Sequence, residues 1–249
     1  MHTPDLIVLL ILIACAAASA HWKKLTPAAA LTGGIIGCLV YAGGGYTGLL
    51  LLALFFLLGT AATAWKKKDK LRIKGNAAHQ STRTTGQVIA NGGVAAILGA
   101  LAALIPAHKP LFSLMLAASL SSATSDTLSS ELGVLYGRRN FNILTGKPDE
   151  RGLDGVISLE GLLFGIAGSA VIAAAWFALS NTTGSPDVKS PAGPSLLRSA
   201  AIIVLAGLLG NLADSLLGAT LERKGALSNN AVNFCNTLIA ALFAGALIG

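Results

Sequence analysis

Residues 46–65 read YTGLLLLALFFLLGTAATAW, and Lys66, Lys67 and Lys68 follow them directly. A run of about 20 apolar residues is what an α-helix needs to cross the hydrocarbon core of a bilayer. The rest of the chain has the same character, because it is 53% hydrophobic and only 12% charged. Soluble domains carry about 25% charged residues. This composition excludes a water-soluble domain and a disordered chain, and it predicts a polytopic membrane protein.

Apolar runs recur along the whole chain and predict about eight transmembrane helices in one integral membrane domain, residues 1–249. The runs cover about 4–20, 28–42, 46–65, 86–105, 110–129, 156–179, 197–219 and 229–249. The second run is short and rich in glycine, so it is the weakest of the eight. Lys23 and Lys24 follow the first run, which favours a retained helix over a cleaved signal segment. Because helices satisfy their own backbone hydrogen bonds in lipid, we expect an all-α helical bundle.

Basic residues collect on alternate connections between these runs. The connections 21–27, 66–85, 130–155 and 220–228 hold 15 of the 18, whereas the opposite face holds Lys109, Lys189 and Arg198. The positive-inside rule then places both termini on the non-cytoplasmic side. We expect a protein of the cytoplasmic membrane whose active site opens to the cytoplasm. Topology and anionic membrane lipids account for the net charge of +7, so no nucleic-acid partner is expected.

Carboxylates inside apolar runs are the first functional signal. Asp126 lies in ATSDTLSSELG (123–133) and Asp214 in GNLADSLLGATLE (210–222), so both motifs stand at the ends of odd-numbered runs. A carboxylate at membrane depth is expensive and usually marks a site or a pathway. Paired carboxylates with neighbouring hydroxyls are hard oxygen ligands of the kind that Mg²⁺ takes together with phosphates. A structural pairing with Lys or Arg, or an ion path, stays open at this point.

Three further polar elements accompany the aspartates. Arg83, Gln87 and Asn91 are spaced i, i+4, i+8, which on a helix gives one stripe suited to a phosphate or to a polar helix–helix seam. Residues 151–161, RGLDGVISLEG, form a glycine-rich turn before a helix, where Glu160 is best explained by the helix dipole. Residues 228–233, SNNAVN, are typical of a helix N-cap. The cysteines and histidines show no metal-ligand spacing, so no zinc site is expected.

With these motifs in their order, the sequence resembles an integral membrane family, long labelled as a domain of unknown function. Its plant and cyanobacterial members include phytyl phosphate kinase. The resemblance covers about residues 30–249 and is carried by residues 83–93, 125–133, 152–161, 210–222 and 230–233. The chain departs from the family's pattern at Leu153, where a Thr is usual, and at Glu222, where a Gln is frequent.

The resemblance implies a kinase that uses Mg²⁺ and a nucleoside triphosphate, with CTP favoured, to convert an isoprenoid monophosphate (phytyl or another polyprenyl) to its diphosphate. The expected catalytic residues are Asp126, Asp214 and Arg83. The expected metal ligands are Asp126, Glu131, Asp214 and Glu222. Residues expected to bind the nucleotide and its phosphates are Lys74, Gln87, Asn91, Ser130, Asn211, Ser215 and Gly155.

Two other functions remain open from the sequence. A transporter or flippase for a phosphorylated lipid or anion also places polar half-sites on separate helices. A nucleotidyltransferase that forms a CDP-lipid uses the same metal and nucleotide. Expected partners are the isoprenoid phosphate, the nucleotide and membrane lipids, and the sequence leaves self-association into a homo-oligomer open.

Overall fold

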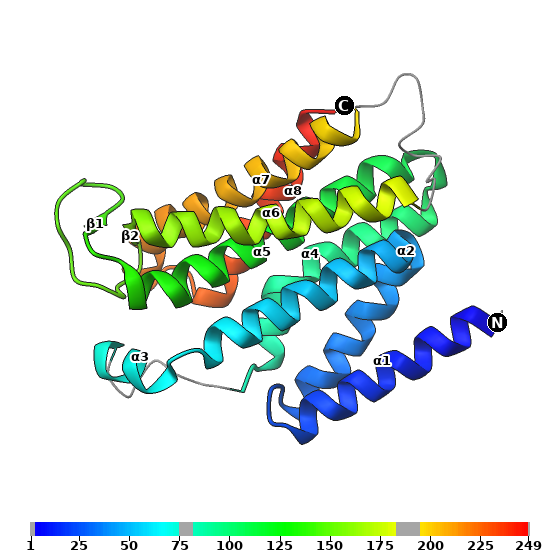
Figure 1. The fold of residues 1–249 in the computed structure, drawn as a ribbon, viewed down its shortest axis with the longest axis horizontal. Helices are drawn as coiled ribbons and strands as arrows, with labels where there is room; N and C mark the ends of the chain where they lie inside the picture. The colour runs from blue at the N-terminus through cyan, green and yellow to red at the C-terminus, as the bar shows by residue number, and fades with distance from the viewer. Residues whose placement is uncertain (1–2, 75–81, 183–194, 249) are drawn as a thin grey trace.

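The computed structural model describes residues 3–74, 82–182 and 195–248. Long helices lie side by side and make up nearly all of it (Figure 1), which confirms the predicted all-α membrane protein. The helices are α1 (Thr3–His21), α2 (Pro27–Ala64), α3 (Lys67–Lys74), α4 (Thr85–Leu104), η2 (Pro106–His108), α5 (Lys109–Tyr136), α6 (Leu159–Thr182), α7 (Leu196–Leu217), η3 (Gly218–Glu222, a π turn) and α8 (Asn229–Ala246). Two short strands, β1 (Asn140–Asn142) and β2 (Val156–Ser158), pair antiparallel.

Within the described ranges, four helices are long and apolar enough to cross a membrane: Pro27–Ala64, Thr85–Leu104, Leu159–Ser180 and Leu196–Glu222. The apolar part of α1 is shorter. The helix α5 is 28 residues long but carries many hydroxyl side chains. The predicted total of eight crossings, and the side of the membrane on which the termini lie, therefore stay predictions.

A sharp bend divides α2, and it separates the second and third predicted runs. Gly45 has φ 57° and ψ −150°, a conformation that only glycine adopts without strain. Figure 1 shows the two arms of α2 meeting at an angle at the N-terminal end of α1. The glycine-rich run, which the sequence marked as the weakest, thus forms a helical arm of its own beside α1.

The connections alternate between the two ends of the bundle. One end (left in Figure 1) carries the α1–α2 turn, α3, the paired strands and the π turn η3, and both chain termini lie toward the other end. The connections predicted to be basic therefore gather at one end. Of the three basic residues predicted for the opposite face, Lys189 lies outside the described residues. We call this end the basic end.

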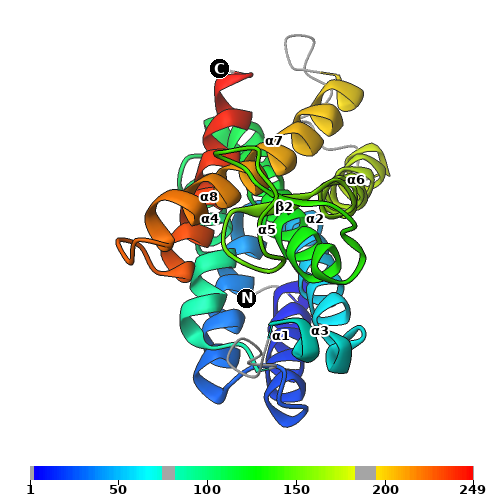
Figure 2. The same cartoon turned by 90° about the vertical axis from the view of Figure 1, so that its left-hand side faces the viewer.

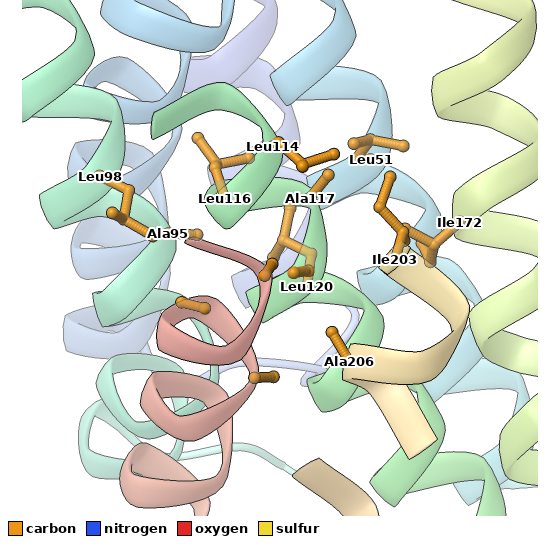
Figure 3. Close-up of a cluster of buried hydrophobic side chains, with 14 of the residues drawn as sticks. Leu51, Ala95, Leu98, Leu114, Leu116, Ala117, Leu120, Ile172, Ile203 and Ala206 are labelled. Carbon is orange, nitrogen blue, oxygen red and sulfur yellow. The ribbon is translucent and has the colours of Figure 1, made fainter. Parts of the chain in front are cut away.

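The helix α5 stands at the centre and packs against α2, α4, α6, α7 and α8. Figure 2, which views the basic end, shows α5 among these neighbours. Its apolar half supplies the middle of the core (Figure 3), where it meets side chains of α2, α4, α6 and α7. The labelled members are Leu51, Ala95, Leu98, Leu114, Leu116, Ala117, Leu120, Ile172, Ile203 and Ala206.

The middle of α5 carries several hydroxyl side chains, yet it is buried as well. Every side chain from Leu116 to Asp126 is buried, including the hydroxyls of Ser121, Ser122 and Ser125. The helix continues to Tyr136, past the predicted end at residue 129. A polar helix surrounded by other helices needs partners for its side chains inside the bundle. Ser121 accordingly donates to the Ile203 carbonyl of α7, and Ser122 donates to Asn236 of α8.

Candidate functional site

A cavity of about 480 Å³ lies at the basic end, between the helices and the loop that carries the two strands. Its wall contains every residue that the sequence nominated for the site except Lys74. These residues are Arg83, Gln87, Asn91, Asp126, Ser130, Glu131, Gly155, Asn211, Asp214, Ser215 and Glu222. Lys74 is the last residue of α3, and its side chain lies outside the described part of the chain. The structure thus brings together four separate sequence motifs, whose chemical roles stay predictions.

Asp126 of α5 and Asp214 of α7 meet in this cavity. Their carboxyl groups lie close enough to interact with each other, and Asp126 is only 7% exposed. Ser130 Oγ lies 3.5 Å from Asp126 Oδ1, and Asn236 Nδ2 donates to Asp214 Oδ1 at 2.8 Å. Two carboxylates in contact repel each other unless a proton or a cation lies between them. The arrangement is therefore suited to a shared cation.

Unpaired polar atoms lie beside the aspartate pair. Within the described residues, Asn211 Nδ2 and Ser125 Oγ are buried without a hydrogen-bond partner. A β-carbon on Gly165 of α6 would lie 2.8 Å from each of these atoms, so both border the same small space. Buried polar atoms in native proteins are normally satisfied by protein or by ordered water. Asn211 lines the cavity, so its amide nitrogen is available to a bound ligand, whereas Ser125 is not among the lining residues.

Arg83 forms another part of the cavity wall. Its backbone N–H donates to the Lys24 carbonyl at 2.9 Å, which ties the start of α4 to the α1–α2 turn. Its guanidinium lies over the rings of Phe55 and Phe56, 5.5 and 5.9 Å from their centroids. A β-carbon on Gly59 would lie 2.6 Å from Nη2, so the glycine makes room for it. The cation is held against an aromatic wall of α2 while it borders the polar cavity.

The predicted stripe on α4 is partly used by the helix itself. Arg83 precedes the first helical residue, yet Arg83, Gln87 and Asn91 all line the cavity. Gln87 Oε1 accepts the Thr84 backbone N–H at 2.9 Å, which caps the helix. Asn91 Nδ2 donates to the Gln87 carbonyl at 2.9 Å, and its Oδ1 is buried without a partner among the described residues. Asn91 therefore offers a buried acceptor, and Gln87 offers its amide nitrogen.

Glu131 has a different environment from the aspartates. Its Oε2 lies 2.6 Å from Nζ of Lys70, and its Oε1 accepts the Thr63 hydroxyl at 3.0 Å. Lys70 is completely buried and also donates to the Ala62 carbonyl at the end of α2. In the part of the chain that the structure describes, no three His, Cys, Asp or Glu side chains lie together. The metal roles of Asp126, Glu131, Asp214 and Glu222 therefore stay predictions. Glu131 is paired with Lys70, and Glu222 lies near enough to Asp214 for their charges to interact.

The loop between α5 and α6 covers the cavity and is fastened to the π turn. Gly155 has φ 73°, and a β-carbon there would overlap Ala219 of η3. Arg223 Nη2 lies 3.0 Å from Asp149 Oδ2, and Arg223 Nε donates to the Asp154 carbonyl at 2.6 Å. Hydrogen bonds from the Asn142 amide, the following backbone N–H and Arg223 hold the pKa of Asp149 below its usual range.

The family of integral membrane proteins described as DUF92 matches residues 10–241. The chain belongs to the DUF92 family. The match begins earlier than the resemblance at residue 30 predicted, and it covers all the motifs that carried the prediction. No solved structure matches the chain.

Relatives come from archaea, plants and cyanobacteria. An uncharacterized membrane protein of Methanocaldococcus jannaschii is 35% identical over 82% of this chain and 77% of its own length. The chloroplastic protein VTE6 of Arabidopsis thaliana is 32% identical over 84% of this chain, which spans only 61% of the length of VTE6. An uncharacterized membrane protein of a Synechocystis strain is 32% identical over 92% of this chain and 84% of its own length. The predicted family membership is therefore confirmed.

Several residues on the cavity wall were not nominated from the sequence. They are Thr63, Thr127, Ser129, Asn140, Arg151, Asp154, Ser158, Asn229 and Asn233. Arg151 was visible as the start of the glycine-rich turn, and its guanidinium donates to the carbonyls of Val134 and Gly137, where it caps α5. The predicted N-cap of α8 is confirmed, because Ser228 Oγ accepts the Ala231 N–H at 3.3 Å. The cap motif also brings Asn229 and Asn233 to the cavity.

The position of Glu160 agrees with the structural role at a helix start that the sequence indicated. It stands in the first turn of α6, where its carboxylate accepts the backbone N–H of Arg138 at 3.3 Å. It is not among the residues that line the cavity. Glu160 is therefore a suitable control for the cavity aspartates, because it is a carboxylate at the same end of the bundle.

Proposed function

We propose that the chain is a Mg²⁺-dependent kinase that transfers a phosphoryl group from a nucleoside triphosphate, with CTP favoured, to an isoprenoid monophosphate. The family includes phytyl phosphate kinase among its plant and cyanobacterial members, and relatives from both kinds of organism match this chain. A role in phytyl or related isoprenoid phosphate metabolism is the coarse form of the proposal. The donor, the metal and the reaction type are its finer part.

The observation that carries the proposal is the contact between Asp126 and Asp214 in a polar cavity at one end of the bundle. Mg²⁺ is usually held by one or two carboxylates together with substrate phosphates and water. The donor set fits this pattern, since two carboxylates meet on the cavity wall and the unpaired Asn211 amide nitrogen on the same wall could donate a hydrogen bond to a phosphate oxygen. Mg²⁺ held by the two aspartates would neutralise charge on the nucleotide phosphates.

The chemistry needs no strong base from the protein. A phosphate monoester has its second pKa near 6, so the acceptor is largely a dianion at neutral pH. One of its oxygens attacks the γ-phosphorus, the bond from that phosphorus to the β–γ bridging oxygen breaks, and the nucleoside diphosphate leaves. The task of the chain is to bind, align and neutralise the two anions, which the side chains of the cavity are suited to do.

The two walls suggest where each substrate binds. The Arg83 guanidinium packs on Phe55 and Phe56 of α2, so a phosphate bound by Arg83 would have apolar surface next to it for an isoprenoid tail. Another part of the wall is made by the loop with Asn140, Asp154 and other polar groups, which suits a nucleotide. We therefore assign Arg83 to the lipid acceptor and the loop wall to the donor.

The position of the aspartates argues against a transporter. At a rise of 1.5 Å per residue, Asp126 lies about 26 Å from the start of α5 and about 15 Å from its end. Asp214 lies within the last turn of α7. Both carboxylates are therefore nearer the basic end, whereas alternating access needs a site near the membrane midplane that can open to either side.

The test uses purified protein in lipid nanodiscs with phytyl or geranylgeranyl monophosphate, Mg²⁺ and each nucleoside triphosphate in turn. We expect nucleoside diphosphate and isoprenoid diphosphate, identified by mass spectrometry. Asp126→Asn and Asp214→Asn should each reduce turnover at least about 100-fold, and Glu160→Gln should retain it. Pyrophosphate with a nucleotide-linked lipid would instead make the chain a nucleotidyltransferase, and full activity in either aspartate variant would refute the assigned site.

A further inference from the structure

Behind the aspartate pair lies a buried amide that does not border the cavity. Asn236 of α8 is 0% exposed, and its Nδ2 donates to Asp214 Oδ1 at 2.8 Å. Its own Oδ1 accepts the Ser122 hydroxyl of α5 at 3.1 Å, and the same hydroxyl lies 3.3 Å from the Asn236 carbonyl oxygen. Three helices are thus connected through one side chain: α5 through Ser122, α8 through Asn236 and α7 through Asp214.

The direction of these hydrogen bonds follows from the chemistry of the groups. An ionised carboxylate only accepts hydrogen bonds, so the amide must turn its NH₂ group to Asp214. The amide oxygen then faces Ser122, whose hydroxyl is able to donate. The opposite orientation of the amide would place its oxygen against the carboxylate oxygen. An ionised Asp214 therefore fixes the orientation of Asn236, and Asn236 in turn fixes the carboxylate.

Close packing holds the connection in place. A β-carbon on Gly210 would overlap Ser122 Oγ and lie 3.0 Å from the Asn236 carbonyl oxygen. Gly210 precedes Asp214 by one helical turn, so the glycine lets α7 approach α5 and α8 at the level of the aspartate. Ser122 and Asn236 are both fully buried, so water does not compete for these hydrogen bonds.

We propose that Asn236 is a positioning residue that orients Asp214 toward a divalent cation, with Ser122 holding the amide. The inference rests on the metal site of the proposed function. Groups that hydrogen-bond to a metal ligand fix its orientation, and their loss typically weakens metal binding or activity about 10- to 100-fold. Because Asn236 does not line the cavity, its effect on the cation is transmitted through Asp214.

The experiment measures cation binding without turnover. Mn²⁺ is titrated into the protein in nanodiscs and followed by electron paramagnetic resonance. Asn236→Leu keeps a similar volume and removes the donor, and we expect Mn²⁺ affinity to fall about 10- to 100-fold. Ser122→Ala removes the hydroxyl that holds the Asn236 amide but leaves the amide itself in place, so we expect a smaller loss of Mn²⁺ affinity, about threefold. The matched control is Thr237→Val, because Thr237 is the next residue and is equally buried. Within the described residues, its hydroxyl donates to the Phe234 carbonyl of its own helix.

The outcomes separate the inference from the function. Folded Asn236→Leu that binds Mn²⁺ within twofold of wild type would overturn the inference, and so would a wild-type protein that binds no Mn²⁺. If Asn236→Leu does not fold, Ser122→Ala decides in the same way, against Thr237→Val as reference. If Mn²⁺ affinity depends on Asn236 but no isoprenoid monophosphate is turned over, the positioning role stands and the kinase proposal fails.

Discussion

The ion pair between Lys70 and Glu131 predicts a large and specific loss of stability for Lys70→Met. Lys70 is 0% exposed, and its Nζ lies 2.6 Å from Glu131 Oε2 and 2.5 Å from the Ala62 carbonyl oxygen. Met fills a similar space without the charge. Removing one partner of a buried ion pair typically costs about 3–5 kcal/mol, because the other charge stays buried. Glu131 is 19% exposed and interacts with the charge of Arg83, so we expect about 3 kcal/mol.

Equilibrium unfolding in mixed micelles, followed by tryptophan fluorescence, measures the free energy of unfolding. The double variant Lys70→Met/Glu131→Gln should lose less than the sum of the two single variants, because neither charge is then left unpaired. Lys68→Met is the matched control, since Lys68 lies on the same helix with an exposed side chain. Its unfolding free energy should stay within about 0.5 kcal/mol of wild type.

A loss below about 1 kcal/mol in Lys70→Met, or strictly additive losses in the double variant, would refute the reasoning. The same variants test the role of Glu131. If Glu131 serves the ion pair, Glu131→Gln should lower stability and leave Mn²⁺ affinity within a few-fold of wild type. If Mn²⁺ affinity instead falls as much in Glu131→Gln as in Asp126→Asn, Glu131 is a metal ligand.

Three further predictions test the cavity walls and the covering loop. Arg83→Lys should raise the KM for the isoprenoid monophosphate about tenfold and change the KM for the nucleotide little, because Lys lacks the planar guanidinium that binds phosphate through two hydrogen bonds. Steady-state kinetics with each substrate varied in turn measures both KM values. Gly155→Ala should cost about 2–3 kcal/mol of unfolding free energy, because its β-carbon would overlap Ala219 at a positive φ. Gly146→Ala, with positive φ but open space, should cost about 1 kcal/mol in the same assay. Because the pKa of Asp149 is lowered in the folded protein, its carboxylate adds stability above its ordinary pKa, and this stability is lost as the pH falls through the folded pKa. Asp149→Asn lacks this contribution. When the pH is lowered below about 4, the thermal midpoint of the variant should therefore decrease less than that of wild type.

The meeting of the two aspartate motifs was predictable from the sequence. The fifth and seventh apolar runs are separated by one run, so they cross the bilayer in the same direction and end on the same side. Asp126 and Asp214 lie near the ends of those runs, which places both at one end of the bundle before any contact is known. Their direct contact additionally needs α5 and α7 to be neighbours, which they are.

Other features depend on contacts that composition and periodicity do not encode. The sequence indicated a basic connection at 66–85, but not that α3 turns Lys70 inward to the end of α2. The strands β1 and β2 have three residues each and pair within the covering loop, too short a pattern to be predicted from alternation. The helix α5 extends to Tyr136 because its polar residues form contacts inside the bundle. The length of an apolar run does not indicate the stability that such contacts add.

Asp126 and Glu131 contact different helices because of their spacing on α5. Both belong to one motif on α5, five residues apart. At about 100° per residue they point about 140° apart around the helix, so they face different neighbours. Asp126 meets α7, and Glu131 meets Lys70 of α3 and Thr63 of α2. One motif thus contributes both carboxylates to the cavity wall, and Glu131 in addition attaches α5 to α2 and α3. Asp126→Asn should accordingly change cation binding, and Glu131→Gln should change stability.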